Sequence, residues 1–265
     1  GGGGGGGRCE VNETLEALVH ANGTRCILYL VAHDKESEQM ARKFSRCKES
    51  WIQPVTIRST VFFESVLYRD VFPPYQKEWD SMDYVVTATY KTVGTALHYN
   101  GFTQNLQLIQ DALTVAREGD WDIVPFLRSG SGTMSFCTYF HGKAFRDAWD
   151  ALLVELGYSL PLIRSLDEHK SFYRNIFVIK PRLLRSLMAF MQRAMQVAES
   201  DPVVRGLLSQ DSRYKEGQEA VAMRVFGTKY YQLHPFVFER LPAFFLHAEN
   251  AKICAATAGP CPYNS

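Results

Sequence analysis

The sequence predicts an α/β fold with a mainly parallel sheet. Strand-like and helix-like segments alternate along most of the chain, which is typical of parallel sheets whose strands are joined by helices. The strand-like segments are short and apolar on both faces, as in "ILYLVA" at residues 27–32, and such runs indicate strands buried between two helical layers. Hydrophobic residues make up 46% of the chain and charged residues 22%, which is enough apolar material for a substantial core.

The individual elements follow from periodicity and from residues that stop helices. Buried strands are expected at residues 26–32, 51–57, 84–88, 121–127 and 175–180. Helices are expected from about residue 35 and over residues 62–72, 103–118, 142–157 and 181–200. Pro73 and Pro74 should end the second helix, Gly157 should end the fourth, and Pro181 suits the first turn of the last.

The chain shows neither an internal repeat nor an internal linker, so one domain is expected over residues 24–250. Residues 1–23 begin with "GGGGGGG" and are expected to be a linker, and residues 251–265 a tail. Cys254 and Cys261 bracket a turn-rich stretch and form the most plausible disulfide among six cysteines. N-x-T sequons at Asn12 and Asn22 favour a Golgi or other secretory lumen over the cytoplasm by a small margin.

Charge and motifs exclude several classes of function. A net charge of +1 gives no field for a nucleic-acid partner. The sequence has no apolar run of the roughly 18–20 residues that a transmembrane segment requires. It also lacks the phosphate loop of nucleoside triphosphatases, the glycine fingerprint of dinucleotide enzymes, the serine elbow of hydrolases and the His-Glu-x-x-His zinc motif.

Ligands of open α/β sheets bind at the carboxyl ends of the strands, so the residues that end each strand are the first candidates. At the third strand, a lysine could neutralise a departing diphosphate, whereas threonine hydroxyls are poor sole ligands for Mg²⁺ or Mn²⁺. The alternative is a solvated strand end or turn, with Asp34 capping a helix. The residues expected to contact such a ligand are Ala32, His33, Thr87, Thr89, Tyr90 and Lys91.

Asp120 and Asp122 flank Trp121 in "GDWDIVPF" and would share one face of an extended segment. Two convergent carboxylates can hold Mn²⁺ or Mg²⁺, and such an ion could stabilise a nucleoside-diphosphate leaving group. The acids precede the apolar run, so they lie at the amino end of a strand and reach the active edge only if this strand is antiparallel. The alternative is that both are ordinary acidic residues at the start of a strand, without a role in metal binding.

Four segments resemble nucleotide-sugar glycosyltransferases of capsular and exopolysaccharide biosynthesis. They are "LYLVAHDK", "EWDSMDYVVTATYK", "FYRNIFVIKPRLLRSLMAFM" and "VAMRVFGTKYYQLHPFVFERL", and the likeness extends from about residue 27 to residue 241. The chain departs from the family pattern where Asp34 separates His33 from Lys35, and "TATYK" lacks the His-Tyr-Arg-Arg run common in the family. The resemblance implies a GT-A-like fold, a three-layer α/β/α sandwich with the donor lying across the carboxyl edge of the sheet.

The resemblance also implies an activity, namely transfer of a sugar from a nucleotide-diphosphate donor to a hydroxyl of a glycan or glycoconjugate. Glu239 would be the base, and Arg174 and Asn175 would line the acceptor side. Two alternatives remain open. Glu239 and Arg240 could be a structural ion pair, and the chain could be a non-catalytic carbohydrate-binding or scaffold protein that retains the fold.

Overall fold

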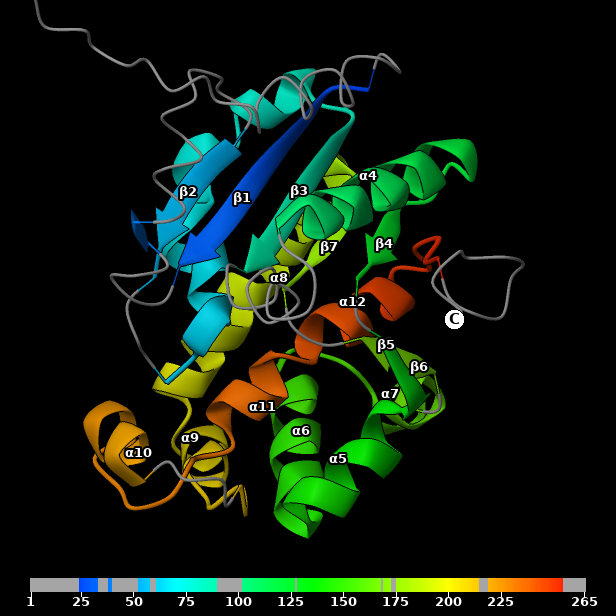
Figure 1. Cartoon of the computed structure of the whole chain (residues 1–265). Helices are drawn as coiled ribbons and strands as arrows, with labels where there is room; N and C mark the ends of the chain where they lie inside the picture. The colour runs from blue at the N-terminus through cyan, green and yellow to red at the C-terminus, as the bar shows by residue number, and fades with distance from the viewer. Residues whose placement is uncertain are drawn as a thin grey trace, which may run out of the picture.

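The computed structural model is an α/β fold built around a five-stranded mixed sheet (Figure 1). It describes residues 24–32, 38–39, 52–57, 61–89, 102–126, 128–167, 169–172, 175–214 and 219–254. The strands lie in the order β2-β1-β3-β7-β4. Their bounds are β1 Cys26–Ala32, β2 Ile52–Thr56, β3 Tyr84–Thr89, β4 Ile123–Pro125 and β7 Phe177–Ile179.

Four of these strands point the same way and β7 runs against them. β1 pairs in parallel with β2 and β3, whereas β7 is antiparallel to both β3 and β4. The expected α/β class is therefore confirmed, with one reversed strand that the apolar pattern does not signal. The reversal decides which residues lie at each edge of the sheet.

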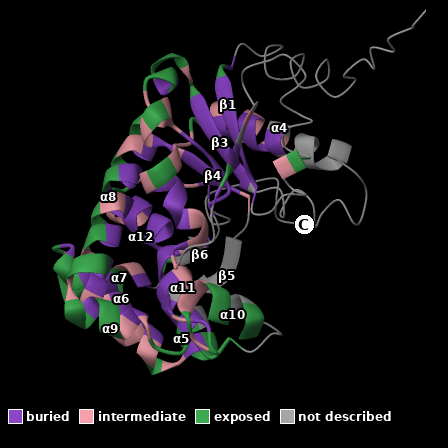
Figure 2. Cartoon of the chain, turned by 90° about the vertical axis from the view of Figure 1, so that its left-hand side faces the viewer, coloured by how far each residue is buried: buried purple, intermediate pink, exposed green. Residues whose placement is uncertain are grey.

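Each face of the sheet is covered by helix, which gives three layers. Residues alternate across β3, so that Val85 faces one core while Val86 and Ala88 face the other. The first core is covered by α8 (Pro181–Ser200), and the second by α4 (Phe102–Glu118). Figure 2 shows the buried strands between these layers. At about 1.5–3 kcal/mol per fully buried aliphatic side chain, the two cores are the main source of stability.

The segment after β2 forms a chain of short helical turns where a regular helix is expected. It comprises η1 (Phe63–Val66), the π-helical η2 (Leu67–Val71), η3 (Pro73–Tyr75) and η4 (Glu78–Ser81). Large rings fix its path, because Phe72 packs on both Tyr29 and Trp79, and the Trp79 indole donates a 2.8 Å hydrogen bond to the Tyr29 hydroxyl. Aromatic packing thus overrides the regular helical period here.

The remaining helices form a lobe below the carboxyl ends of β1 and β2, which we call the helical lobe (Figure 1). Its core is continuous with the core under the sheet. The predicted helix before Gly157 is confirmed as α6, and Gly157 follows it with a φ of +96°. The lobe contains α5 Thr133–His141, α6 Lys143–Glu155, α7 Leu160–Asp167, α9 Pro202–Leu208, α10 Glu219–Phe226, α11 His234–Phe238 and α12 Leu241–Ala248, with the strand pair β5 Arg128–Gly132 and β6 Lys170–Phe172.

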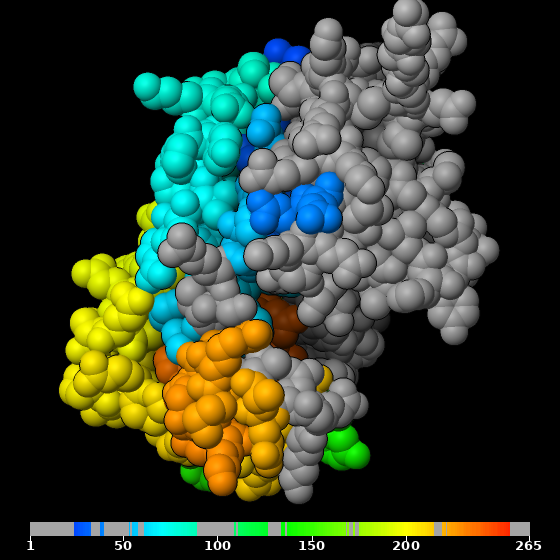
Figure 3. Space-filling model, turned by 60° about the vertical axis from the view of Figure 1, so that its left-hand side comes forward, coloured from blue at the N-terminus to red at the C-terminus, as the bar shows by residue number. Residues whose placement is uncertain are grey.

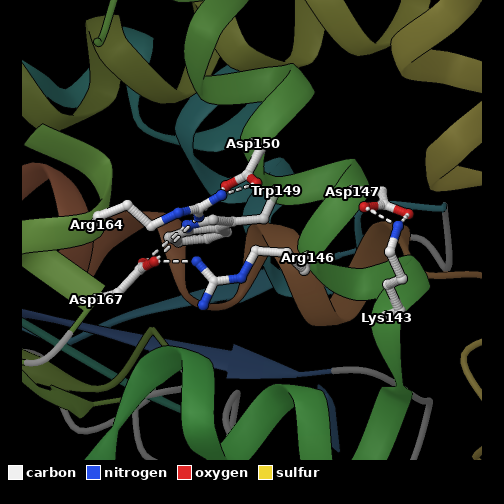
Figure 4. Close-up of polar contacts among 7 residues, drawn as sticks. All are labelled: Lys143, Arg146, Asp147, Trp149, Asp150, Arg164 and Asp167. Carbon is white, nitrogen blue, oxygen red and sulfur yellow. Dashed lines mark hydrogen bonds and ion pairs between the residues drawn. The ribbon is translucent and has the colours of Figure 1, made fainter. Parts of the chain in front are cut away.

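A buried carboxylate joins α6 to α7 in this lobe (Figure 4). The Asp167 side chain is 2% exposed, pairs with Arg146, and accepts a 3.2 Å hydrogen bond from the Trp149 indole. Arg164 lies 3.6 Å away and makes two hydrogen bonds to Asp150. Burial raises the pKa of Asp167 despite the attraction of Arg146. For the charged form of Asp167, the unfavourable free energy of burial therefore exceeds the favourable free energy of its ion pairs.

The first residues of the expected tail pack along β4. Ile253 forms a β-bridge with Ile123, and the Cys254 amide donates a 3.0 Å hydrogen bond to the Ile123 carbonyl, so the packed domain continues through residue 254. Cys254 is disulfide-bonded, while its expected partner Cys261 lies outside the described residues. Within the described part of the chain, no helix combines the length and apolarity needed to cross a bilayer.

Candidate functional site

The carboxyl edge of the sheet gathers four chain segments. β1, β2 and β3 end at this edge because they run in parallel, and β7 begins there because it is reversed. The Thr87–Phe177 pairing continues toward Thr89 on β3 and Asn175 before β7. The reversal of β7 therefore brings Asn175, expected on the acceptor side, to the edge where the donor is expected.

Asn175 is held firmly at this edge. Its side chain is buried, and its Oδ1 accepts a 2.7 Å hydrogen bond from the hydroxyl of Tyr68, which lies in η2. Burial raises the pKa of that hydroxyl, so Tyr68 stays protonated and donates. The bond links the start of β7 to the turns after β2, which are more than a hundred residues earlier in the sequence.

Two of the expected donor-binding side chains are buried below the edge. Ala32 is fully buried, and its carbonyl accepts a hydrogen bond from the Ile57 amide. Thr87 is also fully buried, between its sheet partners Tyr29 and Phe177. In this structure neither side chain can touch a ligand, because the sheet and the layers that cover it bury Ala32 at the end of β1 and Thr87 within β3.

The Thr87 hydroxyl has no hydrogen-bond partner within the structure described. An unsatisfied buried hydroxyl costs stability, so Thr87→Val should raise the free energy of unfolding by about 1 kcal/mol. Urea denaturation of the two proteins measures this difference. A loss of stability in the valine variant would mean that the hydroxyl has a partner in solution.

The other expected residues of this edge are only partly described. The backbone of Thr89 pairs with Val31 in β1. His33, Tyr90, Lys91 and Arg174 lie outside the described residues, so their roles remain predictions.

Glu239 lies between α11 and α12, on the side of the helical lobe that meets this edge. The ring of Phe62, in the turn before η1, packs 4.7 Å from the ring of Phe238. The Glu239 side chain is 28% exposed, and its carboxylate pairs with the buried guanidinium of Arg240 at 3.2 Å. Arg240 is itself anchored by a 2.7 Å hydrogen bond to the Phe236 carbonyl. The arrangement holds a partly exposed carboxylate in a fixed position.

Asp120 and Asp122 lie at the opposite edge of the sheet. β4 runs in the same direction as β1 and β3, so residues before it are at the amino edge, which is also where the reversed β7 delivers Lys180. Lys180 reaches Asp120 at 2.8 Å and Asp122 at 3.3 Å, and Arg182 reaches Asp122 at 2.9 Å. The second oxygen of Asp122 accepts a hydrogen bond from the Lys252 amide. Both oxygens of Asp122 are therefore engaged in structural contacts, and the expected metal role of the pair gains no support.

These contacts predict unequal effects for the two acids. Burial opposes the charge on Asp122, but the bonds from Lys252, Lys180 and Arg182 outweigh burial and hold its pKa below the usual value. Asp122→Ala should therefore lower the free energy of unfolding by about 1–3 kcal/mol. Asp120→Ala should change it little, because that side chain is 82% exposed. Thermal melts of both variants, with and without Mn²⁺, would contradict this assignment if Mn²⁺ stabilised the wild type alone.

Sequence reasoning missed the aromatic residues that connect the edge to the helical lobe. Tyr68 bonds to Asn175, and Phe62 packs on Phe238. In the sequence these two residues are marked only by the aromatic-rich stretch after β2, which predicts core packing equally well. Among the described residues, no group of three or more His, Cys, Asp and Glu side chains is placed to hold a metal ion. Comparison of the chain with protein-family models, curated proteins and solved structures finds no match.

Proposed function

We propose that this protein is a glycosyltransferase that moves a sugar from a nucleotide-diphosphate donor to a hydroxyl of a glycan or glycoconjugate. The observation that carries the proposal is the meeting of the ends of β1, β2 and β3 with Asn175 at one edge, which the contact between Phe62 and Phe238 joins to the segment that carries Glu239. The carboxyl edge of an open α/β sheet is where such folds bind nucleotides. The resemblance of the sequence segments to nucleotide-sugar glycosyltransferases supports sugar transfer as the reaction at this edge.

In the proposed reaction, the acceptor oxygen forms a bond to the anomeric carbon of the sugar while the bond from that carbon to the diphosphate breaks. The proton of the acceptor hydroxyl passes to the carboxylate of Glu239, which Arg240 holds in place. Asn175, buried and fixed by Tyr68, is proposed to position the acceptor side of this edge without touching the sugars. Lys91 and His33 are proposed to contact the donor, and Lys91 to offset the charge of the departing diphosphate. The proposal assigns no divalent cation to Asp120 and Asp122.

The test is calorimetric titration with UDP-, GDP- and TDP-sugars, with and without Mn²⁺, followed by a transfer assay with any donor that binds. Glu239→Gln should lower kcat about 10²–10⁴-fold, the range for loss of a general base, and leave donor affinity unchanged. Asp120→Ala is the matched control, because it removes an exposed carboxylate at the opposite edge of the sheet. It should leave kcat and donor affinity unchanged. Absence of binding by every donor would overturn the proposal.

A non-catalytic carbohydrate-binding protein is the second candidate. The ion pair between Glu239 and Arg240 favours it, because a carboxylate engaged by a buried guanidinium is equally well explained as a structural group. Glycan binding without donor binding or transfer would identify this second function.

A further inference from the structure

The helical lobe contains a hollow that the proposed reaction does not use. It has a volume of about 670 Å³, within the range of roughly 300–1,000 Å³ typical of small-molecule sites. Three tyrosines and four charged residues line it: Asp211, Arg213, Tyr214, Glu219, Lys229, Tyr230 and Tyr231. Figure 3 shows the surface around α10, in orange, beneath the cyan turns that follow β2.

The wall of the hollow is held by bonds that do not involve a ligand. The Ser212 amide donates a 2.8 Å hydrogen bond to the Tyr231 carbonyl, and the Ser212 carbonyl lies 2.8 Å from a ring nitrogen of the buried His141. Asp211 forms a β-bridge with Gln232. The two segments that carry the tyrosines are thus fixed side by side before anything binds, which lowers the entropic cost of recognition.

The lining has a definite chemistry. Tyr214 and Tyr230 are 40% and 38% exposed, so their rings offer flat apolar surfaces to a ligand. Two carboxylates, Asp211 and Glu219, are balanced by two cations, Arg213 and Lys229, so the lining has no net charge. A nucleotide or another polyanion gains little from such a lining. A sugar ring suits it, because its C–H face stacks on aromatic rings while its hydroxyls bond to charged groups of either sign.

The hollow also lies on the correct side of the molecule for an acceptor. Phe63, at the start of η1 after β2, packs 6.1 Å from the ring of Phe226 in α10 and 6.2 Å from the ring of Tyr231. Tyr231 lines the hollow, so its contact with Phe63 connects the hollow to the helical turns that follow the carboxyl end of β2.

We infer that this hollow binds a neutral pyranose unit of a glycan. In the transfer reaction this unit would be a part of the acceptor that lies away from its reacting hydroxyl. The sugar-binding part stands on the hollow alone, whereas the acceptor role rests on the proposed glycosyltransferase function. The tyrosines supply the stacking surface, and Asp211 and Glu219 accept hydrogen bonds from ring hydroxyls.

Binding can be measured without a donor, by saturation-transfer NMR with methyl glycosides of glucose, galactose, mannose and N-acetylglucosamine and their β-linked disaccharides. At least one probe should bind, and Tyr230→Ala should raise its Kd about tenfold. Tyr230→Phe keeps the ring and should retain most of the affinity. Tyr139→Ala is the control, because it removes an exposed tyrosine of α5 that does not line the hollow.

The outcomes separate this inference from the proposed function. Glycan binding that depends on Tyr230, without any donor binding, would keep the sugar site and overturn the transferase. Donor binding and transfer that are indifferent to Tyr230→Ala would keep the transferase and overturn the acceptor role of the hollow. Failure of every glycoside to bind, or equal binding by the wild type and Tyr230→Ala, would overturn the sugar site.

Discussion

Acidification from pH 7 to about pH 4 is expected to remove most of the stability of this protein, through two buried histidines. His141 and His234 are 4% and 5% exposed, and burial lowers the pKa of each from 6.5 to about 4. In the unfolded chain both rings take up protons as the pH falls below about 6.5, whereas in the folded protein they stay neutral. Their contribution is therefore complete above pH 6.5 and is lost progressively toward pH 4.

The size of this effect follows from the shifts. Lowering the pKa of each ring to about 4 corresponds to roughly 3 kcal/mol, so the two rings together approach the total stability of a typical domain. Urea denaturation at half-unit pH steps measures the slope. His234→Phe should flatten it by about half, because it removes one of the two rings. A free energy of unfolding that is constant from pH 7 to pH 4.5 would contradict the expectation.

Removal of the Asp167 carboxylate should be the most damaging single substitution of a polar side chain in the helical lobe. Asp167→Ala leaves the Trp149 indole and the Arg146 guanidinium without their acceptor, and breaking a buried pair on one side costs about 3–5 kcal/mol. Asp167→Asn keeps an acceptor for Trp149 and should cost less. The pKa of Asp167 is raised, so its charged form is relatively disfavoured in the fold, and the asparagine penalty should shrink further as the pH rises above the unfolded carboxyl pKa.

The matched control is the neighbouring pair of Lys143 and Asp147, on the same helix α6 (Figure 4). These side chains are 85% and 41% exposed, so Asp147→Ala should cost at most about 0.5 kcal/mol. Thermal unfolding followed by circular dichroism compares the variants. Equal losses of stability in the two alanine variants would show that burial does not distinguish the two ion pairs.

The sequence was most informative where one signal decides the structure alone. Proline at the start and apolar spacing along its length predict α8, and Gly157 predicts the end of α6. Strand existence was likewise predictable, because β1 and β3 are apolar on both faces. Strand direction was not, since an apolar run looks the same in either orientation.

That ambiguity governed the predictions at the candidate site. The interpretation of Asp120 and Asp122 depended on the direction of β4, which is fixed only by its pairing with β7. The acids instead meet Lys180 and Lys252, which are 60 and 130 residues away from their respective partners and give no local signal. A hydroxyl near the end of a strand predicts a ligand contact for Thr87, yet its sheet neighbours Tyr29 and Phe177 flank it and it is buried. Side-chain partners of this kind appear only when the chain is folded.

The place of β7 in the sheet also bears on the order in which the protein assembles during synthesis. Among the described residues, β4 joins the sheet through β7, which follows it by about fifty residues, and it also forms a bridge with Ile253, near the end of the described chain. A nascent chain can pair β1, β2 and β3 early, but it must hold β4 unpaired until β7 has left the ribosome. Long-range pairing of this kind slows folding and exposes strand edges to association, so the middle of the chain is where a chaperone would be most useful.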